Sequence, residues 1–520
     1  MIGVLYRWEN RTSGELVLAA LRRSVTSSGA KQVAIWDLPQ HNFLLAISPD
    51  EVQGQALLDW LAQGPRKLLL FGQLPQCLIQ HFGMTPYAWP EPTAPWARSP
   101  SAPSGHFAQS EAFIHYLPSG KDLGVQNWER ALERFDFTDE WNNLGFGAVR
   151  AEGTPWSLTS PLRAPDGAEL ANVQLNDKVL ASYCALFDEV GSSVLWVNRE
   201  VGVIDSFEWR MVENFISSWR HDVLPCFPVI SEVPYGHDAA ITMRLDCDED
   251  IASARALWGA YCEAQVPLSL AIHTNNLPDD EHSAFLREFL AEGGVLLSHT
   301  ATHAPDWGGS YGAAHWEGLE SRKKIQQACG VRVEYAVSPF HQSPDYALAA
   351  LCDVGYRGCI GGIIRNDPAF LIARGGELAH LPKGFVGHSQ QSMLHGDCML
   401  IDGDPLAIFK RAFDCAYETR TLFGYLDHPF SSRYQYGWPD EEARISAHQA
   451  FISYIRENTE QPLFLDECRA MDFLRHRAAV QLCREERGIV AYVPETGDDL
   501  RLAVEFRGST DEITHGVVLV

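Results

Sequence analysis

Two acids at the end of a predicted strand are the residues of this chain best placed to do chemistry. Residues 239–250 read AAITMRLDCDED, and the first seven alternate apolar with small or polar side chains, which is typical of a buried strand. Alternate residues of an extended chain face the same side, so Asp246 and Asp248 should project together while Cys247 faces away. Such a pair either binds a divalent cation or divides the roles of base and ligand. The same acids would also suit the start of a helix, and that alternative stays open.

Two more polar clusters follow predicted strands later in the chain. In SHTATH, His299 and His303 are four residues apart, and in a helical turn both would face the same side, which suits two imidazoles on one cation. In YLDHPF, Asp427 and His428 end a late strand. An HxxxH pair alone also occurs as a capping or surface pair. The hypothesis of a site therefore depends on the three strand ends being found together.

The elements that must position these residues alternate between strand and helix. From Pro234 onward about seven strand–helix units follow one another, which predicts a TIM-like barrel, complete or distorted, with function at the carboxyl ends of its strands. Residues 1–83 show a similar α/β alternation and predict a largely parallel sheet, and a helix is predicted near 126–137. We expect an α/β domain over 1–230, the barrel over 231–477 and a small β appendage over 478–520.

Composition excludes several classes of function. The 520 residues are 46% hydrophobic and carry a net charge of −26, which indicates folded domains and argues against nucleic-acid or anionic-membrane partners. No apolar run is long enough to span a bilayer, and the first residues show no secretory signal. The 12 cysteines are scattered without CxxC pairs, as in a reducing compartment. We therefore expect a cytoplasmic protein without a membrane span.

Residues 234–477 resemble the polysaccharide deacetylase family, carbohydrate esterase family four and its wider homologues. The resemblance implies a distorted (β/α) barrel that removes acetyl groups from N-acetylated sugars. It also implies Asp246 as the base, His428 as the general acid, and a metal site made of Asp248, His299 and His303. Here the two acids are spaced DCD instead of being adjacent, as in divergent members of the family. Residues 1–230 loosely resemble the amidotransferase-like domains beside some deacetylases, but Cys77, in LPQCLIQ, lacks the glycines of a nucleophile elbow.

One motif departs from the family pattern. The family has an arginine that orients the base near a proline after the fourth strand, whereas AVSPFHQ keeps Pro339 and places Val337 where the arginine is expected. Three other arginines are candidates to replace it, namely Arg244, Arg365 and Arg433. Surface or packing roles for all three are equally compatible with the sequence.

The residue types fit this chemistry independently of the family. Two histidines and a carboxylate leave open positions on one divalent ion, and these ligand types favour Zn²⁺. Such an ion acidifies water and polarises an amide carbonyl. Asp246 would accept the proton of the water and His428 would protonate the departing amine. Pro339, His341, Trp307 and Arg433 are the predicted substrate contacts. An N-acetylated saccharide is the expected substrate; another amide, or a glycan-binding protein without catalysis, is the alternative.

Overall fold

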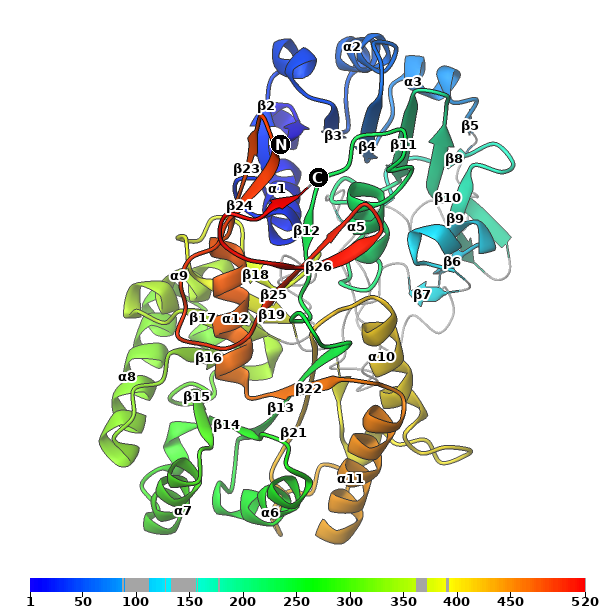
Figure 1. Cartoon of the computed structure of the whole chain (residues 1–520). Coiled ribbons are helices and arrows are strands. Elements are labelled where there is room, and N and C mark those ends of the chain that lie inside the picture. Colours follow the sequence, from blue (N-terminus) through cyan, green and yellow to red (C-terminus); the bar gives the residue numbers. More distant parts are fainter. Residues whose placement is uncertain are drawn as a thin grey trace.

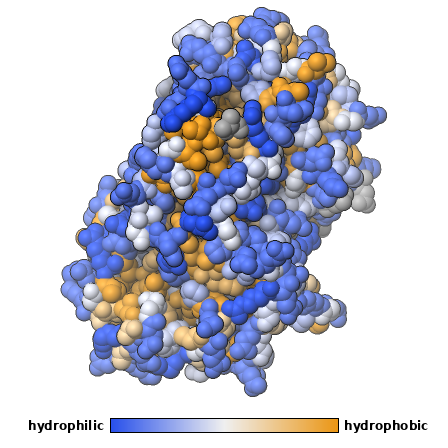
Figure 2. All heavy atoms as spheres, viewed as in Figure 1, coloured by the Kyte–Doolittle hydropathy of each residue, from blue (hydrophilic) through white to orange (hydrophobic). Residues whose placement is uncertain are grey.

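The structure is a computed structural model that describes residues 1–86, 88, 112–126, 128–131, 156, 158–175, 178–361, 372–389 and 392–519. Figure 1 shows two lobes, an upper one from the first part of the chain, with the C-terminal strands beside it, and a lower one from the middle and later part. Figure 2 shows a mostly hydrophilic face with hydrophobic side chains gathered in each lobe. None of the described helices is long and apolar enough to cross a membrane. None of the twelve cysteines, all of which lie within the described ranges, forms a disulfide bond.

The upper lobe is built on a nine-stranded sheet. Its strand order is β2-β1-β3-β4-β11-β10-β9-β6-β7, and the first five of these strands are parallel. The parallel strands are β1 (Ile2–Leu5), β2 (Ala30–Val33), β3 (Phe43–Ile47), β4 (Arg66–Phe71) and β11 (Ser192–Val197). The antiparallel strands are β10 (Lys178–Asp188), β9 (Glu169–Leu175), β6 (Ala112–Tyr116) and β7 (Glu129–Ala131). A short pair, β5 (Thr85–Pro86) and β8 (Leu162–Arg163), lies outside this sheet.

Two helices connect parallel strands, as the alternating sequence pattern predicts, namely α1 (Arg11–Val25) between β1 and β2 and α2 (Glu51–Leu61) between β3 and β4. Helix α3 (Gln76–His81) follows β4 and α5 (Trp209–Ser217) follows β11. The 3-10 turns of this lobe are η1 (Trp8–Asn10), η2 (Ile35–Gln40) and η4 (Pro118–Leu123). The prediction of a helix near 126–137 is wrong for its described residues, because β7 pairs antiparallel with β6 at the edge of the sheet. Tertiary strand pairing here overrides local helical periodicity. Residues 132–137 lie outside the described residues.

The lower lobe contains a ten-stranded, mostly parallel sheet. The path runs β18-β19-β17-β16-β15-β14-β13-β21-β20, with β22 also paired to β13, and only the β18–β19 pair is antiparallel. The strands are β13 (Ala239–Cys247), β14 (Ser269–Ile272), β15 (Val295–Ser298), β16 (Tyr335–Val337), β17 (Gly358–Gly361), β18 (Gly376–Glu377), β19 (Val386–Ser389), β20 (Ser392–Met393), β21 (Phe423–Asp427) and β22 (Pro462–Leu465). No pairing among the described strands joins β18 to β20. The fold is therefore mixed α/β with parallel sheets, and a closed TIM barrel is not observed.

Helices surround this second sheet in Figure 1. They are α6 (Arg255–Ala264), α7 (Asp280–Ala291), α8 (Tyr311–Cys329), α9 (Asp345–Val354), α10 (Ala407–Glu418), α11 (Glu441–Glu457) and α12 (Glu467–Ala479). Short 3-10 turns follow several strands, namely η5 (Ala252–Ala254), η6 (Thr274–Asn276), η7 (Pro305–Gly308), η8 (Pro339–His341) and η10 (Gly396–Cys398). These turns lie in the connections that leave the carboxyl ends of the strands, so they shape the edge where the predicted site residues gather.

Strand β13 is the centre of the lower sheet. It is buried along its whole length and pairs with β21 on one side and with β22 and then β14 on the other. Its apolar face, with Ile241, Met243 and Leu245, packs into the lower hydrophobic core. Alternation therefore places Thr242, Arg244 and Asp246 together on the opposite face. The strand buries three polar side chains, and they require partners inside the protein.

The C-terminal segment forms strands, as its sequence predicts. Strands β25 (Leu502–Phe506) and β26 (Ser509–Ile513) form a sheet with β12 (Val229–Ile230). Strands β23 (Gln481–Glu485), β24 (Gly488–Tyr492) and β27 (Val518–Leu519) form another. One hydrophobic core joins Ile2, Leu474 and Leu502, which come from three distant parts of the chain. The predicted domain boundaries at residues 230 and 477 stay a prediction, and the segments on either side of them contribute to this one core.

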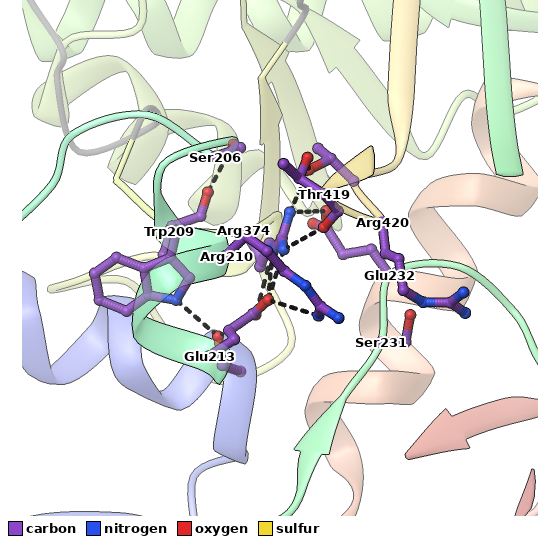
Figure 3. A network of polar contacts seen from close by, with 12 residues as sticks. Ser206, Trp209, Arg210, Glu213, Ser231, Glu232, Arg374, Thr419 and Arg420 are labelled. Atoms are coloured by element: carbon purple, nitrogen blue, oxygen red, sulfur yellow. Dashed lines mark hydrogen bonds and ion pairs between the residues drawn. The ribbon is translucent and has the colours of Figure 1, made fainter. Parts of the chain in front are cut away.

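A buried ion-pair network connects the two large sheets, as Figure 3 shows. Arg374 lies in the segment before β18, and its Nε donates to both carboxylate oxygens of Glu213 on α5 at 3.1 Å. Its Nη2 donates to the carbonyl of Thr419 at 2.8 Å, and Nη1 lies 3.8 Å from Glu232 Oε2. Burial alone would raise the pKa of Glu213, but the guanidinium outweighs burial and lowers it. The carboxylate therefore stays charged inside the junction.

Arg374→Met should destabilise the fold strongly, because it leaves the Glu213 carboxylate buried without its cation. Loss of one partner of a buried pair costs about 3–5 kcal/mol of unfolding free energy. Arg357→Met is the matched control, since Arg357 is 50% exposed in its 3.1 Å pair with Glu334 and should change stability by at most about 1 kcal/mol. Urea unfolding followed by tryptophan fluorescence measures both. Equal losses in the two variants would contradict a stabilising role for this junction.

Candidate metal centre and hydrolytic site

The predicted site residues follow three strands that end at one edge of the lower sheet. Asp248 comes directly after β13, His299 directly after β15, and His428 directly after β21. These strands are parallel within the sheet, so their carboxyl ends meet at the same edge. The structure brings the three clusters together in this way, although they are separated by 51 to 180 positions in sequence.

Asp248, His299 and His303 converge on one point. Oδ1 of Asp248 lies 3.1 Å from Nε2 of His299 and 3.3 Å from Nε2 of His303. The two imidazole Nε2 atoms are 3.0 Å apart. These three atoms are the ligand types of a His-His-carboxylate site, and all of them lie within 4.8 Å of one another. A single divalent cation would contact all three.

The surroundings of this cluster fit a cation. Oδ1 of Asp248 is buried and has no hydrogen-bond partner among the described residues, which is costly unless a positive charge lies against it. Nδ1 of His299 bonds to the carbonyl of Val337 at 3.1 Å, so its Nε2 remains directed toward the cluster. Such a bond on the far nitrogen is how metal-ligating histidines are oriented.

Protonation in the cluster also suits metal binding. Burial and the neighbouring His299 lower the pKa of His303 to about 4, so this imidazole is neutral. Burial would raise the pKa of Asp248, but its histidine partners outweigh that effect and hold the pKa well below its usual value. Burial would lower the pKa of His299, yet the two carboxylates raise it. Without a cation, a proton on His299 offsets those carboxylates, and a bound cation would replace that proton.

A carboxylate that the sequence did not reveal shapes the loop of His303. Oε2 of Glu317, on α8, accepts the backbone N–H groups of Ala301 and Thr302 at 2.8 and 2.9 Å. In this turn His303 has φ 54°, a left-handed conformation that costs energy for a residue with a side chain. Glu317 is itself buried. No motif marks it, because the helix that carries it is recognised only by its packing against the loop.

Arg244 is the candidate arginine that contacts Asp246. Its Nε donates to Oδ1 of Asp246 at 2.7 Å, and its Nη2 donates to Oδ2 at 3.3 Å. Burial would raise the pKa of Asp246, but Arg244 and the nearby His299 lower it to about 2. On the other side of Arg244, Nη1 lies 3.6 Å from the buried Glu467 at the start of α12. The base candidate is therefore held as a carboxylate in one orientation.

His428 lies opposite this pair and is held by two rings. Its Nε2 is 3.4 Å from Oδ2 of Asp248, and its Nδ1 shares a 2.7 Å hydrogen bond with Nε2 of His395. The ring of Tyr436 stacks on the imidazole, with centroids 4.0 Å apart and planes at 14°. These contacts fix the imidazole plane and direct Nε2 toward the Asp248 cluster.

His395, Asp427 and His428 form a second group with metal-ligand composition. The Asp427 carboxylate, however, already accepts Arg444 Nε at 2.8 Å, His448 Nε2 at 3.0 Å and the backbone N–H of His428 at 2.7 Å. Arg444 outweighs the effect of burial and lowers the pKa of Asp427. This carboxylate is saturated by protein donors, so the orphaned oxygen of Asp248 is the better cation ligand.

The predicted substrate contacts divide into buried and exposed residues. Trp307 is fully buried and donates Nε1 to the carbonyl of Gln342 at 2.8 Å, so the prediction that it lines a sugar cleft is wrong. Pro339 and His341 are also buried, in the turn η8. Arg433 is 81% exposed and pairs with Glu249 at 3.0 Å, away from Asp246. Of the other candidate arginines, Arg365 lies outside the described residues.

Exposed aromatic rings, instead, lie beside the cluster. Phe340 is 45% exposed, and its ring centroid is 4.5 Å from that of His303. Tyr434 is 50% exposed and lies 4.1 Å, edge to face, from Tyr436. The sequence carries no signal for Phe340, because its left-handed backbone conformation, φ 50°, cannot be inferred from its residue type.

No family model matches this chain, and no curated protein matches it. Among solved structures, it is similar to a putative polysaccharide deacetylase from Mycobacterium smegmatis, at 15% identity over 49% of this chain and 96% of that one, with a TM-score of 0.39. A family 4 acetyl xylan esterase from Clostridium thermocellum in complex with a cobalt ion matches at 11% identity, covering 45% and 90% of the two chains, with a TM-score of 0.30. A CE4 family pseudoenzyme from Bacillus anthracis matches at 10% identity, covering 45% and 66%, also at 0.30.

His303→Ala should abolish stoichiometric metal binding while the chain remains folded, because it removes one of three converging ligands. His221→Ala is the control, since His221 is an exposed imidazole outside the cluster. Metal content after dialysis against Zn²⁺, measured by mass spectrometry, gives the stoichiometry, and circular dichroism checks the fold. A His303→Ala protein that still held one ion per chain would show that the cation site is elsewhere.

Proposed function

We propose that this protein is a metal-dependent hydrolase that removes an acetyl group from an N-acetylated sugar of a glycan or glycan precursor. The observation that carries the proposal is the placement of a fixed carboxylate, Asp246, and a fixed imidazole, His428, around the Asp248, His299 and His303 cluster. The saccharide as substrate comes from the motif resemblance, and the hydrolytic chemistry comes from the site itself.

Asp246 serves as the general base. Its carboxylate is ionised at neutral pH, since Arg244 holds its pKa near 2, and it accepts a proton from the water that attacks the amide carbonyl carbon. The two contacts from Arg244 keep the carboxylate in one orientation. A base of low pKa is weak, so its contribution depends on position more than on basicity.

His428 serves as the general acid on the other side of the site. Its Nε2 faces the cluster and donates a proton to the sugar nitrogen as the carbon–nitrogen bond breaks, releasing acetate and a free amine. The hydrogen bond to His395 and the stacked Tyr436 keep the imidazole in place during this transfer. Water supplies the oxygen that acetate gains, and no covalent bond to the protein forms.

Asp248, His299 and His303 would hold the divalent cation. A cation bound there would polarise the amide carbonyl and increase the acidity of water, and Zn²⁺ suits the two nitrogens and one oxygen. The buried Oδ1 of Asp248, without a hydrogen-bond partner among the described residues, supports this assignment.

Two alternatives use the same residues. Hydrolysis of a different amide would need the same base, acid and cation, so substrate tests must separate it. The second alternative is a glycan-binding protein without catalysis, and the reason for it is that the family arginine is missing from its motif. The contacts of Arg244 with Asp246 favour the hydrolase over this alternative, because they give the base candidate a guanidinium partner from its own strand.

Substitutions at the two acids should separate base from ligand. Asp246→Asn keeps the size of the side chain but cannot accept a proton, so it should retain metal and lose roughly two to four orders of magnitude in kcat. Asp248→Asn should weaken metal binding itself, and added Zn²⁺ should partly restore turnover. His428→Ala should behave like Asp246→Asn. Acetate release from N-acetylglucosamine oligomers, together with metal content, measures all three.

The pattern, more than any single loss, tests the proposal. Two results together would contradict the assignment: near-normal turnover in Asp246→Asn, and lost turnover in Asp248→Asn with metal still bound. Asp248 would then be the base and Asp246 the metal ligand. Metal binding by the wild-type chain without acetate release from N-acetylated sugars would reject the deacetylase and leave the other amides.

Cys77 should play no part in the reaction. Burial and the neighbouring Glu51 raise the pKa of its thiol, which therefore stays protonated and is a poor nucleophile at neutral pH. Cys77→Ala should leave the rate of acetate release within about twofold of the wild type. Loss of activity with intact fold and metal content would instead show that the upper lobe does chemistry.

A further inference from the structure

The upper lobe has a broad cavity, wide open to solvent, of about 660 Å³ at the carboxyl edge of its parallel sheet. It is lined by the segments that follow β1 and β2 and by the first turn of α2. The size is within the range of small-molecule binding pockets. Neither the proposed hydrolytic site nor the motif resemblance uses any residue of this cavity.

The cavity lies where a sheet of this topology binds ligands. Strand β1 connects through α1 to β2 on one side, and the chain then returns to β3 on the other side of β1. Open α/β sheets bind ligands beyond the carboxyl ends of the strands at such a change of direction. Nucleotides are the usual occupants of this position, because their phosphates bind at the first turn of the following helix.

A phosphate is excluded here because carboxylates already occupy the anion positions. Glu200 accepts Asn10 Nδ2 at 3.0 Å and Ser13 Oγ at 2.7 Å at the start of α1, and Ser48 Oγ at 2.8 Å after β3. At the start of α2, Asp50 accepts the backbone N–H of Gln53 at 2.9 Å.

The charge of the side chains that line the cavity also disfavours an anionic ligand. Glu9, Asp37 and Asp50 line the cavity against a single guanidinium, that of Arg7. Arg7 lies 4.0 and 3.9 Å from Glu9 and Asp50, respectively. An anionic ligand would face a surplus of negative charge, so the occupant is neutral or cationic.

Two exposed indoles indicate the chemical class of that occupant. Trp8, in η1, is 76% exposed and Trp36, in η2, is 77% exposed, and both line the cavity. The guanidinium of Arg11 lies 5.1 Å from the ring centroid of Trp8 and helps fix that ring. Large apolar rings gathered at a concave site mark a binding surface. A sugar ring packs its C–H face on an indole, and its hydroxyl groups bond to carboxylates and amides.

We propose that this cavity binds a saccharide chain without anionic groups, with Trp8 and Trp36 as stacking surfaces and with Glu9, Gln32 and Gln53 as partners for its hydroxyl groups. Gln32 and Gln53 also line the cavity. This site is separate from the hydrolytic one, and the proposal stands or falls independently of deacetylation.

Binding to the full-length chain tests the proposal. The probes are tetramers of N-acetylglucosamine, glucosamine and xylose, titrated by calorimetry into an Asp246→Asn chain so that no turnover occurs. At least one tetramer should bind. Trp8→Ala and Trp36→Ala, each added to this chain, should weaken that binding about tenfold or more, as expected for a central aromatic contact. Trp316→Ala is the control, because Trp316 is 49% exposed on α8 in the other lobe and should change nothing.

Several outcomes would overturn the proposal. They are no binding of any tetramer, binding that is unchanged by both indole substitutions, and ADP binding that depends on Trp8 or Trp36. Self-association in sedimentation runs that is lost in Trp8→Ala or Trp36→Ala, without saccharide binding, would identify the indoles as a contact between copies of the chain. Saccharide binding that depends on the indoles in a chain without acetate release would support this site and reject only the hydrolytic proposal.

Discussion

Two carboxylates held close together at the end of one buried strand set the main constraint on this structure. Asp246 and Asp248 are two residues apart. Their negative charges repel each other and their burial removes solvation, so both carboxylates need positive charge nearby. Arg244, on the same strand face, donates a hydrogen bond to Asp246. His299 and His303 lie against the carboxylate of Asp248. Oδ1 of Asp248 faces the imidazoles of His299 and His303, and either a proton on His299 or a bound cation would offset its charge. A cation held at this strand end would offset the negative charge of both carboxylates.

The loops around this strand end are held in strained conformations by buried contacts. Thr300, His303, Phe340, His341 and Tyr436 all have positive φ values between 50° and 67°. Such backbones persist only where the surroundings over-determine them, and the contacts of Glu317 with Ala301 and Thr302 show one way in which this is achieved. The sheet fixes the direction in which each strand ends, and these turns fix the orientation of the side chains that follow.

The sequence pointed to the candidate site residues that follow strands more readily than to the residues that contact and support them. Asp246, Asp248, His299 and His428 were identifiable because strand periodicity and parallel topology together place strand ends at one edge. Arg244 was one of three candidates, since nothing local shows that its side chain turns back to Asp246. Glu317 and Glu467 come from helices that reach the site only through packing. Trp307 was wrongly placed because a left-handed turn, φ 55°, directs its ring into the core.

A shared core packs the two lobes against each other. The hydrophobic cluster that contains Ile2 and Leu474, and the Arg374–Glu213 network, join the sheets without a flexible linker. A saccharide held at the upper cavity would therefore stay in a fixed orientation to the lower site. For a long glycan, binding at one site raises the effective concentration of the same chain at the other, provided that the chain spans both. A short oligosaccharide gains nothing from this coupling, so any preference for long substrates reflects the linkage between lobes and not the chemistry at Asp246.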